Sequence, residues 1–382
     1  MSFELNAEQS QFRDRARAWL AEHAPAHCAA EPPLSIFARS TEAEDREEAH
    51  AALRWQAAKA EGGWAGLTVP TRFGGQGRSV IESLLFDEEE KRYALPLDPL
   101  SVTNGMIVPT LVQWGTDAQR HRLLPDILTG RAIWCQLFSE PGAGSDLAAL
   151  STSARRVDGG WLVNGQKVWT SHAQHAAWGY LLARSERVPD DRHRGITALV
   201  VDMSAPGVTC RPLRQATGGS RFNEVFFDDV FIPEENLLGE AGNGWRVAVT
   251  TLMSERYALD PKVIPLTALC ELAADSGTGP DAVTRLGRIA AKERIVTALK
   301  LQLLDAAARG QEAGPEGSIA KLVTTAALQE AAGLVTDLRG HRARQYDRWS
   351  EFVIGAPGLR IGGGTDEILR NVLAQRALGL PR

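Results

Sequence analysis

The chain has 382 residues, of which 44% are hydrophobic and 23% are charged, and its formal net charge is −5. This is the balance of a globular protein, and the length allows two or three packed units. No stretch approaches the roughly 20 uninterrupted apolar residues of a membrane span. No block of Lys and Arg is dense enough for a nucleic-acid face. The four cysteines lack C-x-x-C spacing and the N-terminus lacks the pattern of a secretory signal, so we expect a cytoplasmic protein with free thiols.

The periodicity of the chain changes twice. Up to about residue 130 it predicts helices at 5–24, 42–61, 79–94, 103–114 and 117–129. Runs of β-branched and aromatic residues then predict strands at 161–163, 166–170, 180–183, 196–202 and 223–228. Helices return at 243–259, 262–276, 281–310, 315–338 and 365–377. We therefore predict an α+β multidomain fold, with an N-terminal helical domain at 1–130, a central β barrel or sandwich at 131–238 and a C-terminal domain like a four-helix bundle at 239–382.

Residues 135–171 contain features of a ligand site. Gly142, Ala143, Gly144 and Ser145 form a loop of small residues, whose backbone can approach a flat or anionic ligand closely. Asn164-Gly165 lies between two apolar runs, which predicts a β-hairpin that carries Trp169 on the same sheet as this loop. Taken alone, such a loop is more often an ordinary turn, and a Trp on a strand usually belongs to a core. His172 and His175 have no third ligand candidate nearby in sequence, so we predict no metal site.

Four segments, in this order and spacing, resemble the acyl-CoA dehydrogenase family. They are SEPGAGSD at 139–146, NGQKVWTS at 164–171, RFNEVFFDDVFIP at 221–233 and IGGGTDEILRNVLAQRALGLPR at 361–382. The resemblance covers nearly the whole chain. It implies an FAD-dependent oxidoreductase of lipid metabolism that dehydrogenates an acyl-CoA thioester between its α and β carbons. It also implies electron-transfer flavoprotein as the electron acceptor and a homodimer or homotetramer as the assembly.

The resemblance also implies which residues hold FAD. Gln136, Phe138 and Ser139 correspond to positions beside the isoalloxazine ring, and Trp169, Thr170 and Ser171 to positions on its other side. Gly144 and Ser145 belong to the loop that touches the flavin phosphate region, and Ser145 also contacts CoA. Ser139 and Ser171 are the expected hydrogen-bonding partners of ring atoms. Thr365, a natural N-cap of the last helix, and Glu367 correspond to further flavin contacts at that helix N-terminus.

Removal of an α-proton requires a carboxylate of raised pKa in a dry cleft. Many family members carry this glutamate in a tetrapeptide before the last helix, where this chain has Gly363. A second group of members carries it on the first helix after the β domain, and Glu255 falls at that position. Ala248, Leu252, Glu255 and Leu259 have the spacing of one helix face, so Glu255 would lie on an apolar stripe that raises its pKa. Without the resemblance, a surface glutamate paired with Arg246 or Arg256 would be the favoured interpretation.

With the resemblance, we predict that Glu255 is the base. Arg256 would orient Glu255 or contact the acyl group. A backbone N–H of Gly363 or Gly364 would donate to the thioester oxygen and so contribute to substrate binding.

Two departures from the family pattern leave alternatives open. Many relatives carry an arginine that contacts the flavin of a neighbouring subunit, and this chain has Val283 there. Arg285 or Arg288 would replace it, or another subunit of a hetero-oligomer would supply the charge. A glycine-rich partner segment is only partly kept, as Gln329, Gly333 and Gly340, with Gln329 as a predicted cofactor contact. The alternatives are a flavin-dependent oxygenase or oxidase on the same fold, or a half-site or non-catalytic subunit of a hetero-oligomeric acyl-CoA dehydrogenase.

Overall fold

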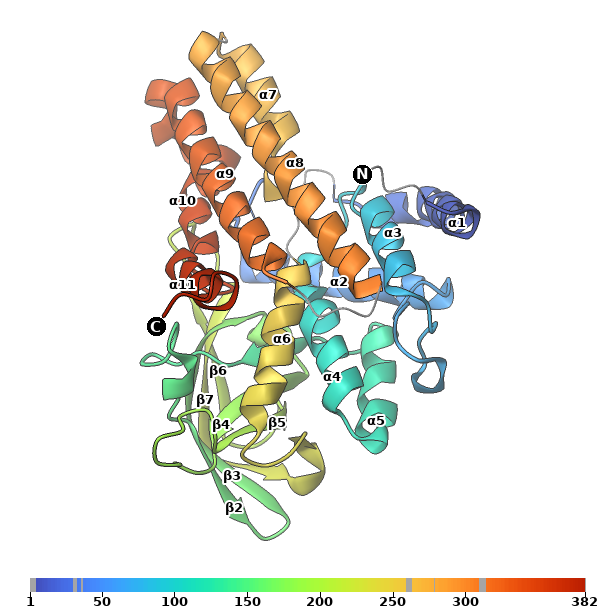
Figure 1. Ribbon diagram of the computed structural model, residues 1–382, viewed down its shortest axis with the longest axis vertical. Helices are drawn as coiled ribbons and strands as arrows, with labels where there is room; N and C mark the ends of the chain where they lie inside the picture. The colour runs from blue at the N-terminus through green and yellow to red at the C-terminus, as the bar shows by residue number, and fades with distance from the viewer. Residues whose placement is uncertain are drawn as a thin grey trace.

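The structure is a computed structural model, and it describes residues 5–381 apart from 30–32, 36, 259–262, 278 and 309–313 (Figure 1). It also leaves out the side chains of 255–258, 304, 307 and 308. The N-terminal part consists of α1 (Ala7–His23), α2 (Glu42–Glu61), α3 (Val80–Glu90), α4 (Val108–Trp114) and α5 (Asp117–Leu128). One π-helical turn, Thr103–Ile107, leads directly into α4. Within the described part of the chain, no helix is both long and apolar enough to cross a membrane.

Four of these helices begin with the same arrangement of N-terminal capping hydrogen bonds. The side chains of Asn6, Thr41, Ser79 and Thr116 each accept a hydrogen bond from the backbone N–H three residues later. The side-chain oxygen of the Gln or Glu at that third position in turn accepts a hydrogen bond from the backbone N–H of the cap residue. Such a capping box satisfies two of the backbone donors that a helix start leaves without partners. This explains why the predicted starts of these helices lie within two residues of the observed ones.

The middle of the chain forms one eight-stranded sheet. Its strands follow the order β6-β7-β3-β2-β4-β5-β8, and β1 pairs in parallel with β4 outside this path. Their bounds are β1 (Trp134–Leu137), β2 (Ser153–Val157), β3 (Gly160–Ser171), β4 (Trp178–Arg184), β5 (Ile196–Asp202), β6 (Val208–Leu213), β7 (Phe222–Pro233) and β8 (Leu237–Leu238). The predicted strand at 196–202 is confirmed residue for residue, whereas β1, β2, β6 and β8 were not predicted.

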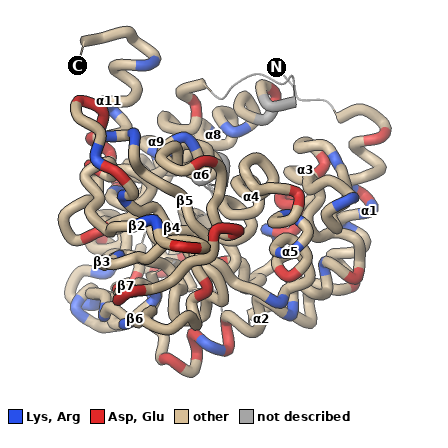
Figure 2. Tube along the Cα trace, turned by 90° about the horizontal axis from the view of Figure 1, so that it is seen from below, with Lys and Arg blue, Asp and Glu red and all other residues tan. Residues whose placement is uncertain are grey.

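Helices then return as α6 (Gly244–Ala258), α7 (Leu266–Asp275), α8 (Pro280–Ala308), α9 (Glu316–Arg339), α10 (Arg348–Leu359) and α11 (Asp366–Arg376). Helices α7 to α10 form the elongated bundle in the upper part of Figure 1, and α6 lies between this bundle, the sheet and α4. The predicted fold class, with helices before and after a sheet, is confirmed. Helix α10 is an addition that the sequence did not predict. Basic and acidic residues are interspersed along the helices α1, α3 and α5 (Figure 2).

Helix α6 is anchored in a core that it shares with the sheet and the N-terminal helices. Val247 and Ala248 are fully buried against residues of α4, α5, β4 and β5. The start of the helix approaches the sheet very closely, because a Cβ at Gly244 would lie 2.6 Å from the backbone N of Ala198. The position of α6 is therefore fixed by the sheet and α4 rather than by the C-terminal bundle alone.

The hairpin predicted at Asn164-Gly165 is wrong. Residues Gly160–Ser171 form one continuous strand, and the register of β3 against β7 shifts between Val163 and Gly165. Gly165 has φ 149°, and a Cβ there would lie 2.5 Å from Thr152 Oγ1 and 2.7 Å from its Cα. Glycine at this position thus allows Thr152, just before β2, to lie close to the bulged strand β3, because no Cβ stands between them. The actual hairpin turn lies at Asp158-Gly159, between β2 and β3.

A buried ion pair holds the loop after β1 to β3. Lys167 Nζ lies 2.8 Å from Glu140 Oε1, and the side chains of the two residues are 0% and 4% exposed. Lys167 also donates to the carbonyl of Phe138 at 2.9 Å. Glu140 accepts from the backbone N–H groups of Ser151 at 2.6 Å and Thr152 at 2.9 Å. Burial raises the pKa of Glu140, but the ammonium of Lys167 and these hydrogen bonds outweigh it and lower the pKa to about 2.

The Gly165→Ala variant tests the close approach of β2 and β3. The added Cβ would clash with Thr152, and the φ of 149° at this position favours glycine. We therefore expect the free energy of unfolding to fall by about 1–3 kcal/mol. Gly142→Ala is the matched control, because a Cβ at Gly142 would meet nothing within 4 Å. Urea unfolding followed by circular dichroism measures both. Equal unfolding midpoints for the two variants would contradict the contact.

The Glu140→Gln variant tests the ion pair. It leaves Lys167 buried without its partner charge, and we expect a loss of about 3–5 kcal/mol of stability at pH 7. The double variant Glu140→Gln/Lys167→Met carries neither charge and should recover most of this loss.

The pH dependence of the same variants isolates the carboxylate. The fold lowers the pKa of Glu140 from 4.5 to about 2. The contribution of the Glu140 carboxylate to the free energy of unfolding is therefore complete above about pH 4.5 and is lost as the pH falls toward 2. This lowering of the pKa corresponds to about 3 kcal/mol of stability. Urea unfolding between pH 7 and pH 3 should show only part of it, because the folded-state pKa lies below pH 3. The Glu140→Gln variant should show a flatter profile below pH 4.5, and parallel profiles for the two proteins would rule out this role.

Candidate active site

A bulge in β3 pushes Trp169 out of the sheet. Lys167 pairs with Val225 and Thr170 with Asn223, so β3 has one more residue than β7 in this interval. Trp169 has φ 61°, and its side chain is 62% exposed. A left-handed conformation at a residue other than glycine costs on the order of 1–3 kcal/mol and persists only where its surroundings enforce it. Strained residues of this kind cluster at functional sites, so Trp169 is a candidate ligand contact.

The loop of small residues lies next to this bulge. The backbone N–H of Val168 donates to the carbonyl of Ser139 at 2.9 Å, which joins β3 to the start of the loop. A Cβ at Gly142 or at Gly144 would meet nothing within 4 Å, and neither residue has a positive φ. Neither the packing nor the backbone of this chain therefore requires glycine at these positions. Close approach by a ligand does explain why both lack a side chain.

The other residues predicted to line the ring divide into two groups. Ser139, Ser171 and Gln136 are half-buried, and Ser145 is exposed on the loop. Phe138 and Thr170 are buried, with the Phe138 ring edge-on to Tyr180 at a centroid distance of 4.9 Å. The Oγ1 atom of Thr170 is buried and has no hydrogen-bond partner within the part of the chain that the structure describes. The structure thus brings the Ser139 and Trp169–Ser171 segments together, while the side chains of Phe138 and Thr170 face inward.

The turn before α11 has a backbone suited to glycine. Gly363 and Gly364 have φ values of 69° and 89°. Lys321 Nζ donates to the carbonyl of Gly364. Thr365 caps α11 as predicted, because its side chain accepts from the N–H of Ile368 at 3.1 Å. The turn that lacks the carboxylate of many relatives is therefore a left-handed loop held from α9.

Charged residues flank this turn. Asp366 is buried and pairs with Arg360 at 2.8 Å, and Thr325 donates to it at 3.0 Å. The side chain of Glu367 is 70% exposed and lies 3.7 Å from Arg370. The N–H of Asp366 donates to the carbonyl of Arg360 at 3.1 Å and that of Ile368 to Thr365, so within the described residues the N–H of Glu367 is the donor left in the first turn of α11 for an anionic group.

The predicted base lies outside the described side chains. Glu255 and Arg256 belong to the backbone of α6, but the structure does not describe their side chains. One and two turns earlier on the helix, Thr251 and Ala248 are fully buried. Thr251 Oγ1 lies 2.8 Å from Thr110 Oγ1 of α4. The register of the helix therefore assigns position 255 to the face that packs against α4 and the sheet.

The residues predicted to contact the flavin of a neighbouring subunit lie on α8 and α9. Arg285 pairs with Asp337 at 2.5 Å, and its guanidinium fills the space above Gly333, where a Cβ would lie 3.1 Å from it. Gln329 Nε2 is buried and has no hydrogen-bond partner among the described residues. Val283 is 58% exposed. Arg285 is thus bound within its own chain, which limits its ability to replace the family's arginine.

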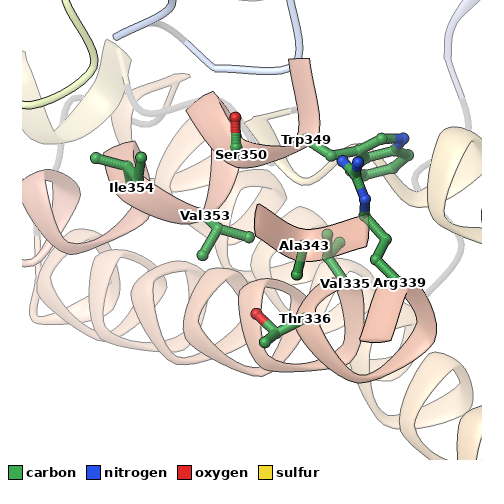
Figure 3. A pocket seen from close by; sticks show the side chains of 8 residues that line it. All are labelled: Val335, Thr336, Arg339, Ala343, Trp349, Ser350, Val353 and Ile354. Atoms are coloured by element: carbon green, nitrogen blue, oxygen red, sulfur yellow. The ribbon is translucent and has the colours of Figure 1, made fainter. Parts of the chain in front are cut away.

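A hollow on the C-terminal bundle is separate from these residues. Its lining comes from α9, α10 and the short helix between them: Val335, Thr336, Arg339, Ala343, Trp349, Ser350, Val353 and Ile354 (Figure 3). None of the predicted site residues belongs to it. Because it holds neither the exposed Trp169 nor the glycine loop, we do not assign it to the candidate active site.

The sequence did not single out Glu140 and Lys167, although both lie inside the motifs SEPGAGSD and NGQKVWTS. A lysine among inward-facing residues of a strand is a signal for a buried partner of opposite charge. Asp98 and Arg221, which also meet near this site, are 123 residues apart and gave no such signal.

Comparisons with known proteins match this arrangement. Models of the acyl-CoA dehydrogenase N-terminal, middle and C-terminal domains match residues 6–131, 135–230 and 277–378. Acyl-CoA dehydrogenase IpdE1 of Mycobacterium tuberculosis is 35% identical over 97% of this chain and 98% of its own length. Acyl-CoA dehydrogenase FadE34 of the same organism is 41% identical over 81% of this chain, which spans only 44% of that protein.

Solved structures agree over the full length. The structure titled Tcur3481-Tcur3483 steroid ACAD superposes with a TM-score of 0.81 at 25% identity and covers 100% of both chains. The ChsE4-ChsE5 complex of Mycobacterium tuberculosis superposes with a TM-score of 0.80 at 29% identity, again over 100% of both chains. Sequence and fold therefore agree, and the chain belongs to the acyl-CoA dehydrogenase family.

Proposed function

We propose that this chain carries out the FAD-dependent dehydrogenation of an acyl-CoA thioester between its α and β carbons. The observation that carries this proposal is the bulge that exposes Trp169 beside the glycine loop at 142–145. The packing of the chain itself does not require glycine at 142 or 144, and the bulge holds Trp169 at the surface at a conformational cost. A flat ring held between these two segments accounts for both.

The residues present fit FAD. Trp169 offers an aromatic face, and the half-buried hydroxyls of Ser139 and Ser171 offer hydrogen bonds to ring atoms. Gly144 and Ser145 would lie along the phosphate region, with Thr365 and Glu367 at the N-terminus of α11 as further contacts. Bound FAD supplies the acceptor for the β-hydride, a task that no protein side chain performs alone.

The acid–base work falls to Glu255 in this proposal. Position 255 lies one turn after Thr251 and two turns after Ala248, which are both fully buried, and this place in α6 supports the proposal. A general base here requires a carboxylate of raised pKa, and we propose that Glu255 is such a group. Glu255 would hold the proton taken from the α-carbon, and Arg256 would orient the carboxylate or the acyl group. The N–H groups of Gly363 and Gly364 would donate to the thioester oxygen, where negative charge develops as the proton leaves.

The substrate class follows from the relatives as a proposal. One similar solved structure is titled a steroid ACAD, and the segment 61–77 resembles bacterial members that take bulky acyl groups. We therefore propose a ring-bearing or branched acyl group, with electron-transfer flavoprotein as the acceptor of the electrons. A panel of straight-chain, branched and ring-bearing acyl-CoAs would rank the substrates directly.

The Glu255→Gln variant tests the base. The amide cannot accept a proton, so we expect kcat to fall at least about 100-fold while the FAD content stays unchanged. Turnover of the acyl-CoA panel with an artificial electron acceptor is the measurement. Glu271→Gln, an exposed position on α7, is the control and should keep full activity. Retained activity of Glu255→Gln would eliminate it as the base, and failure of acyl-CoA to bleach the wild-type flavin without oxygen would favour an oxygenase or oxidase.

A second candidate function is that of one subunit in a hetero-oligomeric acyl-CoA dehydrogenase. Val283 is exposed where many relatives carry an arginine, and Arg285 is engaged by Asp337. One similar solved structure is a complex of two named chains, and FadE34 is more than twice as long as the part that this chain matches. A partner chain could supply the missing positive charge in such an assembly.

The FAD stoichiometry of the purified chain decides between the two assemblies. If the chain is a complete enzyme, light scattering should show a homodimer or homotetramer, and the flavin absorbance should give one FAD per chain. If it is one subunit of a hetero-oligomer, we expect clearly less than one FAD per chain. Full occupancy should then return on co-purification with a related chain.

A further inference from the structure

A polar network at the end of β3 connects the Trp169 segment to the N-terminal helices. His172 has φ 54°, so two residues within four positions, Trp169 and His172, adopt left-handed backbone conformations that side chains disfavour. The strand pairing of β3 with β7 ends at Ser171. The neighbouring contacts must therefore hold the segment 169–172 in place.

The contacts from β7 hold the backbone of this segment. The N–H of His172 donates to the carbonyl of Arg221 at 2.9 Å. Asn223 Nδ2 donates to the carbonyl of Thr170 at 3.1 Å and also to the side chain of Gln174. Asn223 is fully buried, so these donors have no water to compete with. The segment thus takes its curvature from the sheet.

The contacts from the N-terminal helices hold its side chains. Asp98, at the start of a short helix before α4, places Oδ2 3.0 Å from His172 Nε2 and 2.8 Å from Arg221 Nη1. Arg221 Nη2 donates to Glu48 of α2 at 2.7 Å, and its Nε lies 3.8 Å from Asp45 of the same helix. The Arg221 side chain is only 8% exposed. The carboxylate of Asp98 therefore binds both His172 and Arg221. The backbone carbonyl of Arg221 in turn accepts from the N–H of His172.

The single guanidinium of Arg221 serves three carboxylates, Asp98, Glu48 and Asp45. Burial alone would raise the pKa of Asp98, but the hydrogen bonds and charges of His172 and Arg221 hold it below its ordinary value. Burial raises the pKa of Glu48, against the charge of Arg221. A planar arginine fork can bind two carboxylates on different helices at once, which a lysine cannot do with the same geometry.

We propose that Asp98 and Arg221 are positioning residues that act through His172 to hold Trp169–Ser171 against the flavin ring. This inference rests on the proposed function, because it assigns a role at the same flavin platform. The network joins the segment one residue after Ser171, so any displacement of His172 is passed directly to the residues predicted to face the ring. Substitution of Asp98 or Arg221 should therefore alter the spectrum and the potential of the flavin, and not only the stability of the protein.

The test compares Arg221→Met and Asp98→Asn with the conservative Arg221→Lys. The matched control is Arg339→Met, which removes a 7% exposed arginine from a bidentate pair with Asp347 in the C-terminal bundle. Four readouts are needed: hydrogen exchange of peptides covering 165–176 in the FAD-free protein, the visible absorption and circular dichroism of bound flavin, the flavin midpoint potential, and kcat with KM. The urea midpoint of each variant records stability separately.

We expect exchange at 168–174 to rise at least about tenfold in Arg221→Met and Asp98→Asn. The flavin spectrum and potential should shift in the same variants, and kcat should fall about tenfold or more with little change in KM. Arg221→Lys should restore part of each effect, and Arg339→Met should alter only the urea midpoint. If the Arg221 and Asp98 variants lose stability but keep wild-type exchange, spectrum and potential, the network is structural only and the proposal is wrong.

A failure of the proposed function gives a different pattern. Wild-type protein that takes up no FAD under any condition would reject the flavin platform. The exchange measurement, made without FAD, would in that case still report whether Asp98 and Arg221 hold the segment.

Discussion

The buried contact between the Glu140 carboxylate and the Lys167 ammonium is the constraint on which the candidate site depends. Both groups are cut off from water, so each is stable only while the other stays within hydrogen-bond distance. Glu140 lies three residues after β1, and its backbone partners Ser151 and Thr152 directly precede β2. Three chain segments therefore meet at one carboxylate. Since Val168 and Trp169 follow Lys167 directly, the distance between the exposed ring and the glycine loop is set by this contact.

The sheet carries the proposed flavin platform, and the proposed base comes from a helix that the sheet positions. Val247 and Ala248 of α6 lie in the same core as the buried residues of β4, β5 and α4. A shift of α6 relative to the platform would open that core, and the loss of packing around several buried side chains would be unfavourable. The C-terminal bundle, in contrast, extends away from the sheet along α8 and α9 (Figure 1). The bundle can thus change without moving position 255 relative to the sheet.

How much the sequence predicts depends on whether a signal is local. Capping boxes such as Thr41 with Glu44 act within one turn, and the starts of the helices that they cap are predicted within two residues. Asn164-Gly165 and Asp158-Gly159 carry the same hairpin signature, but only the second is a turn. What separates them is the approach of Thr152 to Gly165, a contact that exists only after β2 has paired with β3. Asp98 and Arg221 meet across 123 residues, so periodicity and spacing contain no trace of their contact.

The left-handed turn at Gly363 and Gly364 restricts how this enzyme can evolve. A glutamate introduced at 363 would have to adopt a φ of 69°, which a side chain with a Cβ strongly disfavours. The carbonyl of Gly364 is also held by Lys321, so the turn cannot relax without breaking that contact. A carboxylate at the location that many relatives use would therefore require a different backbone path through this turn. A single substitution of Gly363 by glutamate would strain the turn, so the location of the carboxylate and the shape of this loop are coupled.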